Sequence, residues 1–135
     1  RQEGEFVAAV EVPRPADDED FAVYKISKRM ESDISAVLAA FLLKRGADGR
    51  VVEARLDYGG MAGTPKRARA AEAALLGRPF DAAAVAGARL ALAEDFSPLT
   101  DMRASAAYRL EVAGACLERF RLELEGAPTP LSELT

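Results

Sequence analysis

The sequence has no histidine, no tryptophan and a single cysteine, Cys116, among its 135 residues. These absences exclude zinc sites, iron–sulfur ligation by cysteines of this chain, Ser-His-Asp triads and intrachain disulfides. The longest apolar run, residues 36–43, is much shorter than the roughly 20 residues of a membrane span. We therefore expect neither a metal site nor a membrane partner.

Composition and charge favour one folded domain. Half of the residues are hydrophobic and 30% are charged, as in ordinary globular proteins, and the length suits a single domain. The formal net charge of −4 argues against nonspecific binding of nucleic acid. We expect a single domain over residues 1–135 with a flexible tail at 127–135. Because the chain starts at Arg1 and a strand is predicted almost at once, we also expect a longer protein upstream.

Four segments have strand character, beginning with the apolar run Glu5–Val12 that ends at Pro13. In Phe21–Ile26, alternation places Lys25 with Phe21 and Val23 on one face, and Tyr24 on the other. Asp33–Lys44 fits a helix or a strand by period alone. The Asp-Gly turn at 48–49 and the alternation of Val51–Tyr58 favour a hairpin over Asp33–Tyr58. The predicted apolar face of its second strand comprises Val52, Ala54, Leu56 and Tyr58.

Three helices are predicted after Gly59-Gly60. The first begins at Thr64-Pro65 and stops at Gly77. Asp81 caps the second, which runs to about Glu94, and Asp101 suits the N-terminus of the third. The predicted buried residues are Ala68, Ala71, Leu75 and Leu76 in the first helix, and Ala106, Leu110, Ala113, Leu117, Phe120 and Leu124 in the third. Strands followed by helices predict an α+β layered domain.

Three segments carry groups that could do chemistry. The cations of Tyr24–Arg29 could clamp an anionic or polar cofactor edge, or could be a solvated strand edge blunted by lysine. Residues 58–67 combine glycines with a helix start that presents N–H groups to an anion, or form a plain turn. Structure is the favoured role of Ser97–Arg109, whose arginines could pair with acids. Cys116 is interpreted as a core thiol.

Taken in order, these segments resemble the C-terminal domain of the FAD-binding part of molybdenum hydroxylases, the CO dehydrogenase flavoprotein C-terminal domain family. The similarity is greatest to bacterial xanthine dehydrogenase small subunits. The matching pieces are Val10–Pro13, Phe21–Arg29 with Asp33–Val37, Tyr58–Ala68 with Ala71–Gly77, and Asp95–Arg109. Four motifs in register over residues 5 to about 120 are far more specific than one.

The resemblance implies an antiparallel sheet of three or four strands with three helices packed on it. It implies an upstream domain that binds the FAD pyrophosphate, and a molybdopterin-binding subunit as a second partner. In such a cytoplasmic xanthine dehydrogenase, purines are oxidised at molybdopterin and electrons pass through 2Fe-2S clusters to FAD, which reduces NAD. The alternatives are a medium-subunit domain of an aldehyde or carbon monoxide dehydrogenase, and a cofactor-free interaction module. The isolated chain is expected to be inactive.

The resemblance also carries over to single residues. Lys25 matches a family lysine that contacts FAD, and Val7 lies where the family places an apolar residue against the cofactor. Ile26–Ala36 matches a loop near the flavin and the NAD entrance, in which Asp33 is retained. Ser32 departs from the acid that animal xanthine oxidoreductases carry there. The expected scaffold or interface residues, without catalytic roles, are Lys66, Arg67, Arg103 and Arg109.

Overall fold

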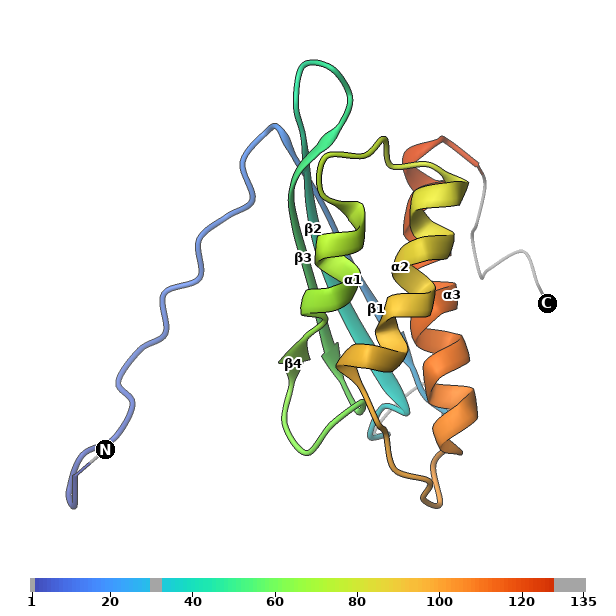
Figure 1. Ribbon diagram of the computed structural model, residues 1–135. Coiled ribbons are helices and arrows are strands. Elements are labelled where there is room, and N and C mark those ends of the chain that lie inside the picture. The colour runs from blue at the N-terminus through green and yellow to red at the C-terminus, as the bar shows by residue number, and fades with distance from the viewer. Residues whose placement is uncertain (1, 30–32, 128–135) are drawn as a thin grey trace.

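Four antiparallel strands form one layer, and three helices cover one of its faces (Figure 1). The computed structural model describes residues 2–29 and 33–127. Along the chain, the elements are β1 (Glu19–Ile26), β2 (Val37–Arg45), β3 (Val51–Gly59), β4 (Lys66–Arg67), α1 (Arg69–Leu75), α2 (Ala82–Asp95) and α3 (Ala106–Leu124). The sheet order β1-β2-β3-β4 follows the sequence, and the predicted α+β architecture is confirmed.

The β2–β3 hairpin forms as predicted. Gly49 has a φ of 76°, which a residue with a side chain rarely adopts, and the Asp48 carboxylate accepts the Arg50 N–H at 3.1 Å. Antiparallel pairing sets Phe41 opposite Leu56. Both are fully buried, so one face of the hairpin faces the helices.

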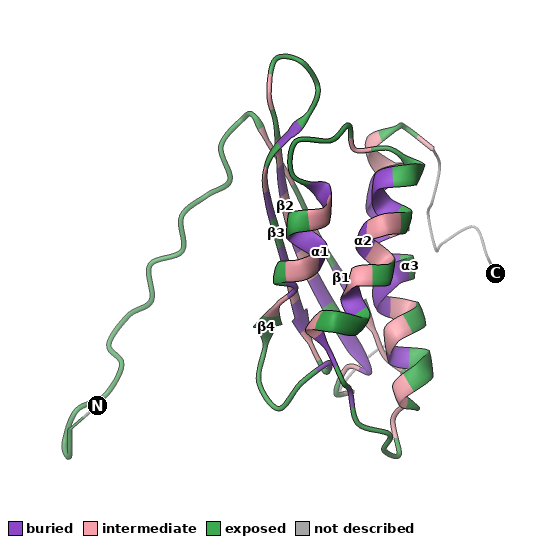
Figure 2. Ribbon diagram, in the orientation of Figure 1, coloured by how far each residue is buried: buried purple, intermediate pink, exposed green. Residues whose placement is uncertain are grey.

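The core lies between the sheet and the helices, where the buried residues of both layers meet (Figure 2). Phe41 is at its centre. The Phe41 ring centroid lies 5.9 Å from that of Tyr24, 5.4 Å from Tyr58 and 5.7 Å from Phe120. These ring pairs, edge-on with Tyr58 and tilted with the other two, join β1, β2, β3 and α3, and they place the Tyr24 face of β1 toward the helices.

One strand face was predicted wrongly at its start. Val51 is 1% exposed and Val52 is 56% exposed, the reverse of the predicted alternation. The ladder pairs Lys44 with Glu53 and Arg45 with Val51, so Val52 is an extra residue in a β-bulge. A bulge shifts the two-residue period by one, which local alternation does not reveal.

The predicted strand at Glu5–Val12 is also wrong. Residues 2–18 are exposed and extend away from the sheet, with no strand among them (Figure 1). An apolar alternating segment becomes a strand only where another strand satisfies its N–H and C=O groups, and no described strand lies beside this one. The sheet's fourth strand is β4. Of the predicted tail 127–135, only Ala127 lies within the described residues.

The helices differ from prediction mainly at their N-termini. α1 begins at Arg69, because Lys66 and Arg67 pair with β3 as strand β4. The Asp81 cap of α2 is confirmed, with Oδ1 accepting the Ala84 N–H at 2.8 Å. α3 begins after Ser105, which accepts the Tyr108 N–H at 3.2 Å, so Asp101 is not at a helix terminus.

The predicted helical faces are largely confirmed. Leu76 is the exception, because it follows α1 with an extended ψ of 135° and is 49% exposed. In the predicted seam of α3, Ala113, Leu117 and Phe120 are buried, and the other three residues are partly buried. No helix among the described residues has the length and apolar character needed to cross a membrane.

Candidate functional site

Two of the three sequence segments with reactive groups, residues 58–67 and 97–109, meet the residue before β2 at one side chain, Arg109, in the first turn of α3. Its guanidinium is 4% exposed. The Nη1 group donates to the carbonyl oxygens of Ala36 and Gly60, the latter at 2.8 Å, and Nη2 donates to Asp101 Oδ1 at 2.7 Å. Residues separated by up to 73 positions are thus held together by one planar cation.

Asp101 is the acidic partner in this arrangement. Its Oδ1 also accepts the backbone N–H of Arg103 at 2.8 Å and that of Ala104 at 3.2 Å. The Arg103 N–H, followed by the Arg109 side chain, lowers the pKa of Asp101 to about 2. The carboxylate is therefore ionised at neutral pH and organises the loop between α2 and α3.

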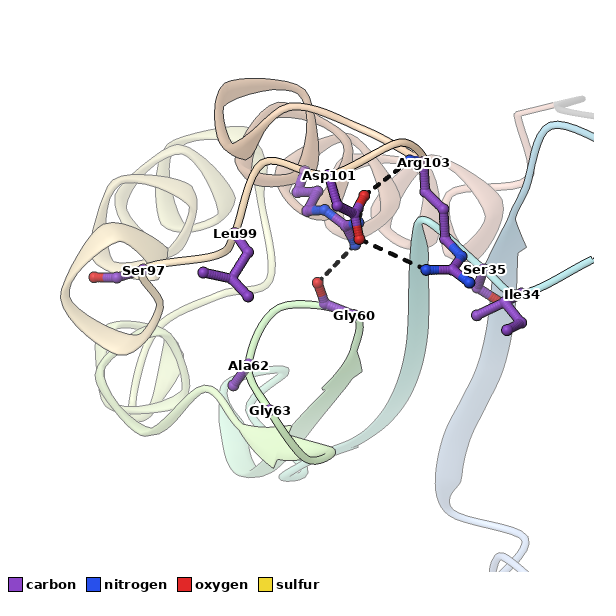
Figure 3. Close-up of a pocket in the computed structure, with 10 residues that line it drawn as sticks. Ile34, Ser35, Gly60, Ala62, Gly63, Ser97, Leu99, Asp101 and Arg103 are labelled. Carbon is purple, nitrogen blue, oxygen red and sulfur yellow. Dashed lines mark hydrogen bonds and ion pairs between the residues drawn. The ribbon is translucent and has the colours of Figure 1, made fainter.

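A pocket of about 450 Å³ opens beside these groups (Figure 3). Figure 3 shows the Gly60 carbonyl pointing toward the loop that carries Asp101, with dashed lines joining Asp101 to Arg103. The lining residues are Ile34, Ser35, Gly60, Ala62, Gly63, Ser97, Leu99, Asp101, Arg103 and Arg109. The lining residues come from 34–35, from the turn after β3 and from residues 97–109, so the pocket exists only after the chain folds.

A second pocket of about 490 Å³ shares Ile34 and Arg103 with the first. Its other lining residues are Lys28, Arg29, Asp33, Ala36 and Met102. Asp33 Oδ2 accepts the Arg29 N–H at 3.1 Å, and the Lys28 ammonium donates to the Met102 carbonyl at 2.9 Å. Predicted site residue Asp33 thus lies in a pocket with two cations from the loop and one from the α2–α3 connection.

The other two predicted cofactor residues lie elsewhere. Lys25 is exposed on β1, in register with Leu38, and lines a different hollow of about 360 Å³ with Tyr24 and Arg119. Val7 is 70% exposed in the extended N-terminal segment. The structure therefore does not bring Lys25, Val7 and Asp33 into one pocket. Ser32 lies outside the described residues.

Of the two alternatives for residues 58–67, the structure contradicts the helix start that presents N–H groups to an anion. Lys66 donates to the Asp95 carbonyl at 2.5 Å and lies 5.4 Å from the centroid of the Phe96 ring. Two N–H groups at the start of α1, those of residues 70 and 71, are occupied by the Asp95 carboxylate at 3.0 Å each. The basic pair belongs to a strand, so no free helix N-terminus faces an anion there.

Arg67 also has a structural partner. It binds Glu72 through two nitrogens at 2.8 and 2.9 Å, and Glu72, 5% exposed, accepts the Leu56 N–H at 2.9 Å. The expected scaffold assignment of Lys66 and Arg67 agrees with these contacts.

Sequence reasoning treated Arg109 as scaffold and did not identify the pocket around it. One signal was present: Arg109 is four residues before Ala113, and so lies on the buried stripe of α3. A charged residue on an apolar stripe indicates a buried ion pair or hydrogen-bond network. The identity of its acceptors had no local signal, because two of them are backbone carbonyls distant in sequence.

The family model of the CO dehydrogenase flavoprotein C-terminal domain matches residues 22–124, which is most of the chain. The chain belongs to this family. It is similar to the carbon monoxide dehydrogenase medium chain of Afipia carboxidovorans, 32% identical over 117 residues that make up 86% of this chain and 40% of that one. It is also similar to nicotinate hydroxylase hnxS of Emericella nidulans, 35% identical over 123 residues, 87% of this chain and 9% of that one.

Solved structures agree with the family assignment. Carbon monoxide dehydrogenase from Hydrogenophaga pseudoflava has a TM-score of 0.71 and 33% identity, over 80% of this chain and 37% of that chain. Quinoline 2-oxidoreductase from Pseudomonas putida 86 has a TM-score of 0.66 and 30% identity, over 83% and 38%. The chain spans at most about two fifths of the curated relatives it matches. The predicted family resemblance is confirmed.

Proposed function

We propose that this chain completes the flavin site in the FAD subunit of a molybdenum hydroxylase, an oxidoreductase. The observation that carries the proposal is the family match over residues 22–124, supported by relatives whose names describe dehydrogenases and hydroxylases. Flavin, when bound, supplies a centre that accepts electrons from one partner and passes them to another. The role of this chain is to bind and orient one side of that cofactor.

The residues of the two pockets are suited to one edge of a flavin. Lys28, Arg29 and Arg103 offer charged donors to carbonyl or phosphate oxygens, while Gly63, whose Cβ position has no atom within 4 Å, leaves space for a planar group. The Nε of Arg109 is a buried donor without an acceptor among the described residues. Pockets of this volume accept small ligands or parts of larger ones, so most FAD contacts are assigned to an upstream domain.

At residue level, the proposal assigns FAD contacts to Lys25, Val7 and Asp33. The support is their match to the family positions and the cationic end of β1, whose Lys25 side chain is exposed and can reach a partner. Because the three residues do not share a pocket in this chain, the cofactor would have to lie along the surface and receive further contacts from the upstream domain.

The finer proposal is a cytoplasmic xanthine dehydrogenase type, in which 2Fe-2S clusters reduce FAD and FAD reduces NAD. Its support is the resemblance of Phe21–Arg29 and Tyr58–Ala68, and the 34% identity over 93 residues to xanthine dehydrogenase of Emericella nidulans. The second candidate is the medium subunit of a carbon monoxide dehydrogenase, favoured by the similarity to the Afipia medium chain. In both candidates a molybdopterin-binding subunit is the partner, and substrate choice lies there.

Lys25→Ala in the full FAD subunit tests the cofactor contact. Loss of a charge-assisted hydrogen bond is expected to weaken FAD binding by about 10- to 100-fold. Flavin released on dilution, measured by its fluorescence, reports the dissociation constant. Lys44→Ala is the matched control, because Lys44 pairs with Asp18 at 2.7 Å at the other end of the β1–β2 ladder. Equal FAD affinity in wild type and Lys25→Ala would refute the assignment of Lys25.

The visible absorption spectrum tests the function as a whole. Protein from the full native reading frame is expected to show flavin bands, and the 135-residue chain alone is expected to show none. A colourless long form would leave only the shared fold, and would favour a cofactor-free interaction module.

A further inference from the structure

We infer that Arg109 is a positioning residue for the flavin site: it holds the Ile34–Ala36 and Gly60 walls of the pocket in place against the loop of Asp101. This inference rests on the proposed function. It concerns a side chain that the family resemblance left as scaffold, and the inference follows from its contacts.

The contacts of Arg109 bridge segments rather than stabilise one element. Its acceptors are the Ala36 carbonyl just before β2, the Gly60 carbonyl just after β3, and the carboxylate of Asp101. Arg121, the other arginine buried in the described part of the chain, binds Glu118 and Glu125 of its own helix region instead. Arg109 therefore determines how three chain segments lie relative to one another.

The packing around Gly60 makes this position sensitive. Gly60 has a φ of 80°, and a Cβ there would overlap the Ala36 carbonyl oxygen and approach Arg109 Nη1 at 3.1 Å. The Gly60 backbone thus lies close to the Ala36 carbonyl because Gly60 has no side chain, and both carbonyls accept from the same Nη1 group. Neither the Ala36 strand start nor the Gly60 turn can shift without breaking a bond to Arg109.

The segments that Arg109 holds carry the groups proposed to face the cofactor. Asp33 and Ile34 precede Ala36 by two or three residues, and Arg103 follows Asp101 by two. A planar guanidinium with fixed donor directions imposes both distance and angle on these segments, whereas a lysine ammonium imposes neither. Small displacements of binding groups weaken the binding and orientation of a cofactor sharply. The fixed geometry of Arg109 and its three acceptors therefore matters for function.

The test compares Arg109→Met, Arg109→Lys and wild type in the purified full-length flavin-containing subunit. Arg109→Met is expected to raise the FAD dissociation constant about ten-fold and to change the visible circular dichroism of the bound flavin. Arg109→Lys is expected to recover part of the FAD affinity and part of the dichroism, because lysine keeps the positive charge but lacks the planar set of donors. Arg89→Met is the matched control, since the half-buried Arg89 of α2 pairs with Glu111 of α3 at 3.1 Å and lines neither pocket.

The outcomes distinguish failure of the proposed function from failure of the positioning role of Arg109. A wild-type subunit without flavin overturns the proposed function and this inference with it. Wild-type flavin affinity and dichroism in Arg109→Met, with only a lower melting temperature, overturn the positioning role alone. If Arg109→Met does not fold, Asp101→Asn replaces it, because it weakens the contact between Arg109 and residue 101. Unchanged flavin dichroism in both Asp101→Asn and Arg109→Lys then overturns the inference.

Discussion

At the scale of single residues, Asp101 shows how a loop gains a defined shape. Its carboxylate accepts two backbone N–H groups and the Arg109 side chain, and its pKa falls from 3.8 to about 2. Because the folded pKa lies below the unfolded one, ionised Asp101 stabilises the fold above about pH 4. That contribution is lost as the pH falls from about 4 through about 2.

Asp101→Asn is therefore expected to destabilise the protein most at neutral pH and progressively less toward pH 2. Urea unfolding followed by circular dichroism at several pH values between about 7 and 2 measures the difference. Asp17→Asn, in the exposed segment 2–18, provides the control. A difference between wild type and Asp101→Asn that does not change with pH would contradict the proposed ionic role.

Gly60→Ala is expected to lower the free energy of unfolding by about 2 kcal/mol or more, since left-handed backbone costs about 1–2 kcal/mol and a clash adds to it. The clash is with the Ala36 carbonyl. Gly63→Ala is the control, because a Cβ at Gly63 meets no atom within 4 Å. Chemical denaturation measures both, and equal stability of the two variants would show that the close approach at Gly60 is unimportant.

At the scale of elements, strand pairing prevails over a local helix-start signal. Thr64-Pro65 has the pattern of a cap, but the next two residues pair with β3, and the Ala68 N–H donates to the Leu56 carbonyl at 2.8 Å. The carboxylate of Asp95, from the end of α2, then caps α1 from another element. The observed caps at Asp81 and Ser105 lie where no strand competes.

The cap assignments predict losses of stability of different size for two alanine substitutions. Ser105→Ala is expected to cost about 1 kcal/mol, the usual value for removing an N-cap hydroxyl. Thr64→Ala is expected to change stability by less than about 0.5 kcal/mol, as for an exposed surface residue. Thermal unfolding of both variants provides the measurement. A larger loss of stability in Thr64→Ala than in Ser105→Ala would indicate that Thr64 caps the first helix after all.

At the scale of the whole molecule, the core between sheet and helices isolates Cys116. The residue is 4% exposed, and burial raises the pKa of its thiol from 9.0 to about 11. Because the folded pKa is the higher one, the thiol's contribution to stability is present below about pH 9 and is lost as the pH rises toward 11.

Modification of Cys116 is therefore expected to report global unfolding. Below about pH 9, a two-unit rise in pKa lowers the thiolate fraction about 100-fold, and burial slows the reaction further. Thiol-reagent kinetics in buffer and in denaturant are expected to differ by at least this factor. Rapid modification of the native protein would show that α3 opens locally at Cys116.

The local sequence predicted β1, the hairpin, the Asp81 cap and the apolar seam of α3, because period and turn chemistry act over a few residues. The four ordered motifs also indicated the family, which the comparison over residues 22–124 confirms. For the candidate site, sequence alone singled out the three segments, including Asp33 and the cations near it. It could not show that they meet.

Only the tertiary structure decided the bulge at Val52, the start of α1, the exposed state of residues 2–18 and the convergence on Arg109. Each depends on which distant group satisfies a backbone N–H or C=O. A residue's own neighbours in the chain carry no record of that choice, because it is made when the sheet and helices pack. The pocket beside Arg109 is therefore a product of the fold, while the side chains that line it were already present in the sequence.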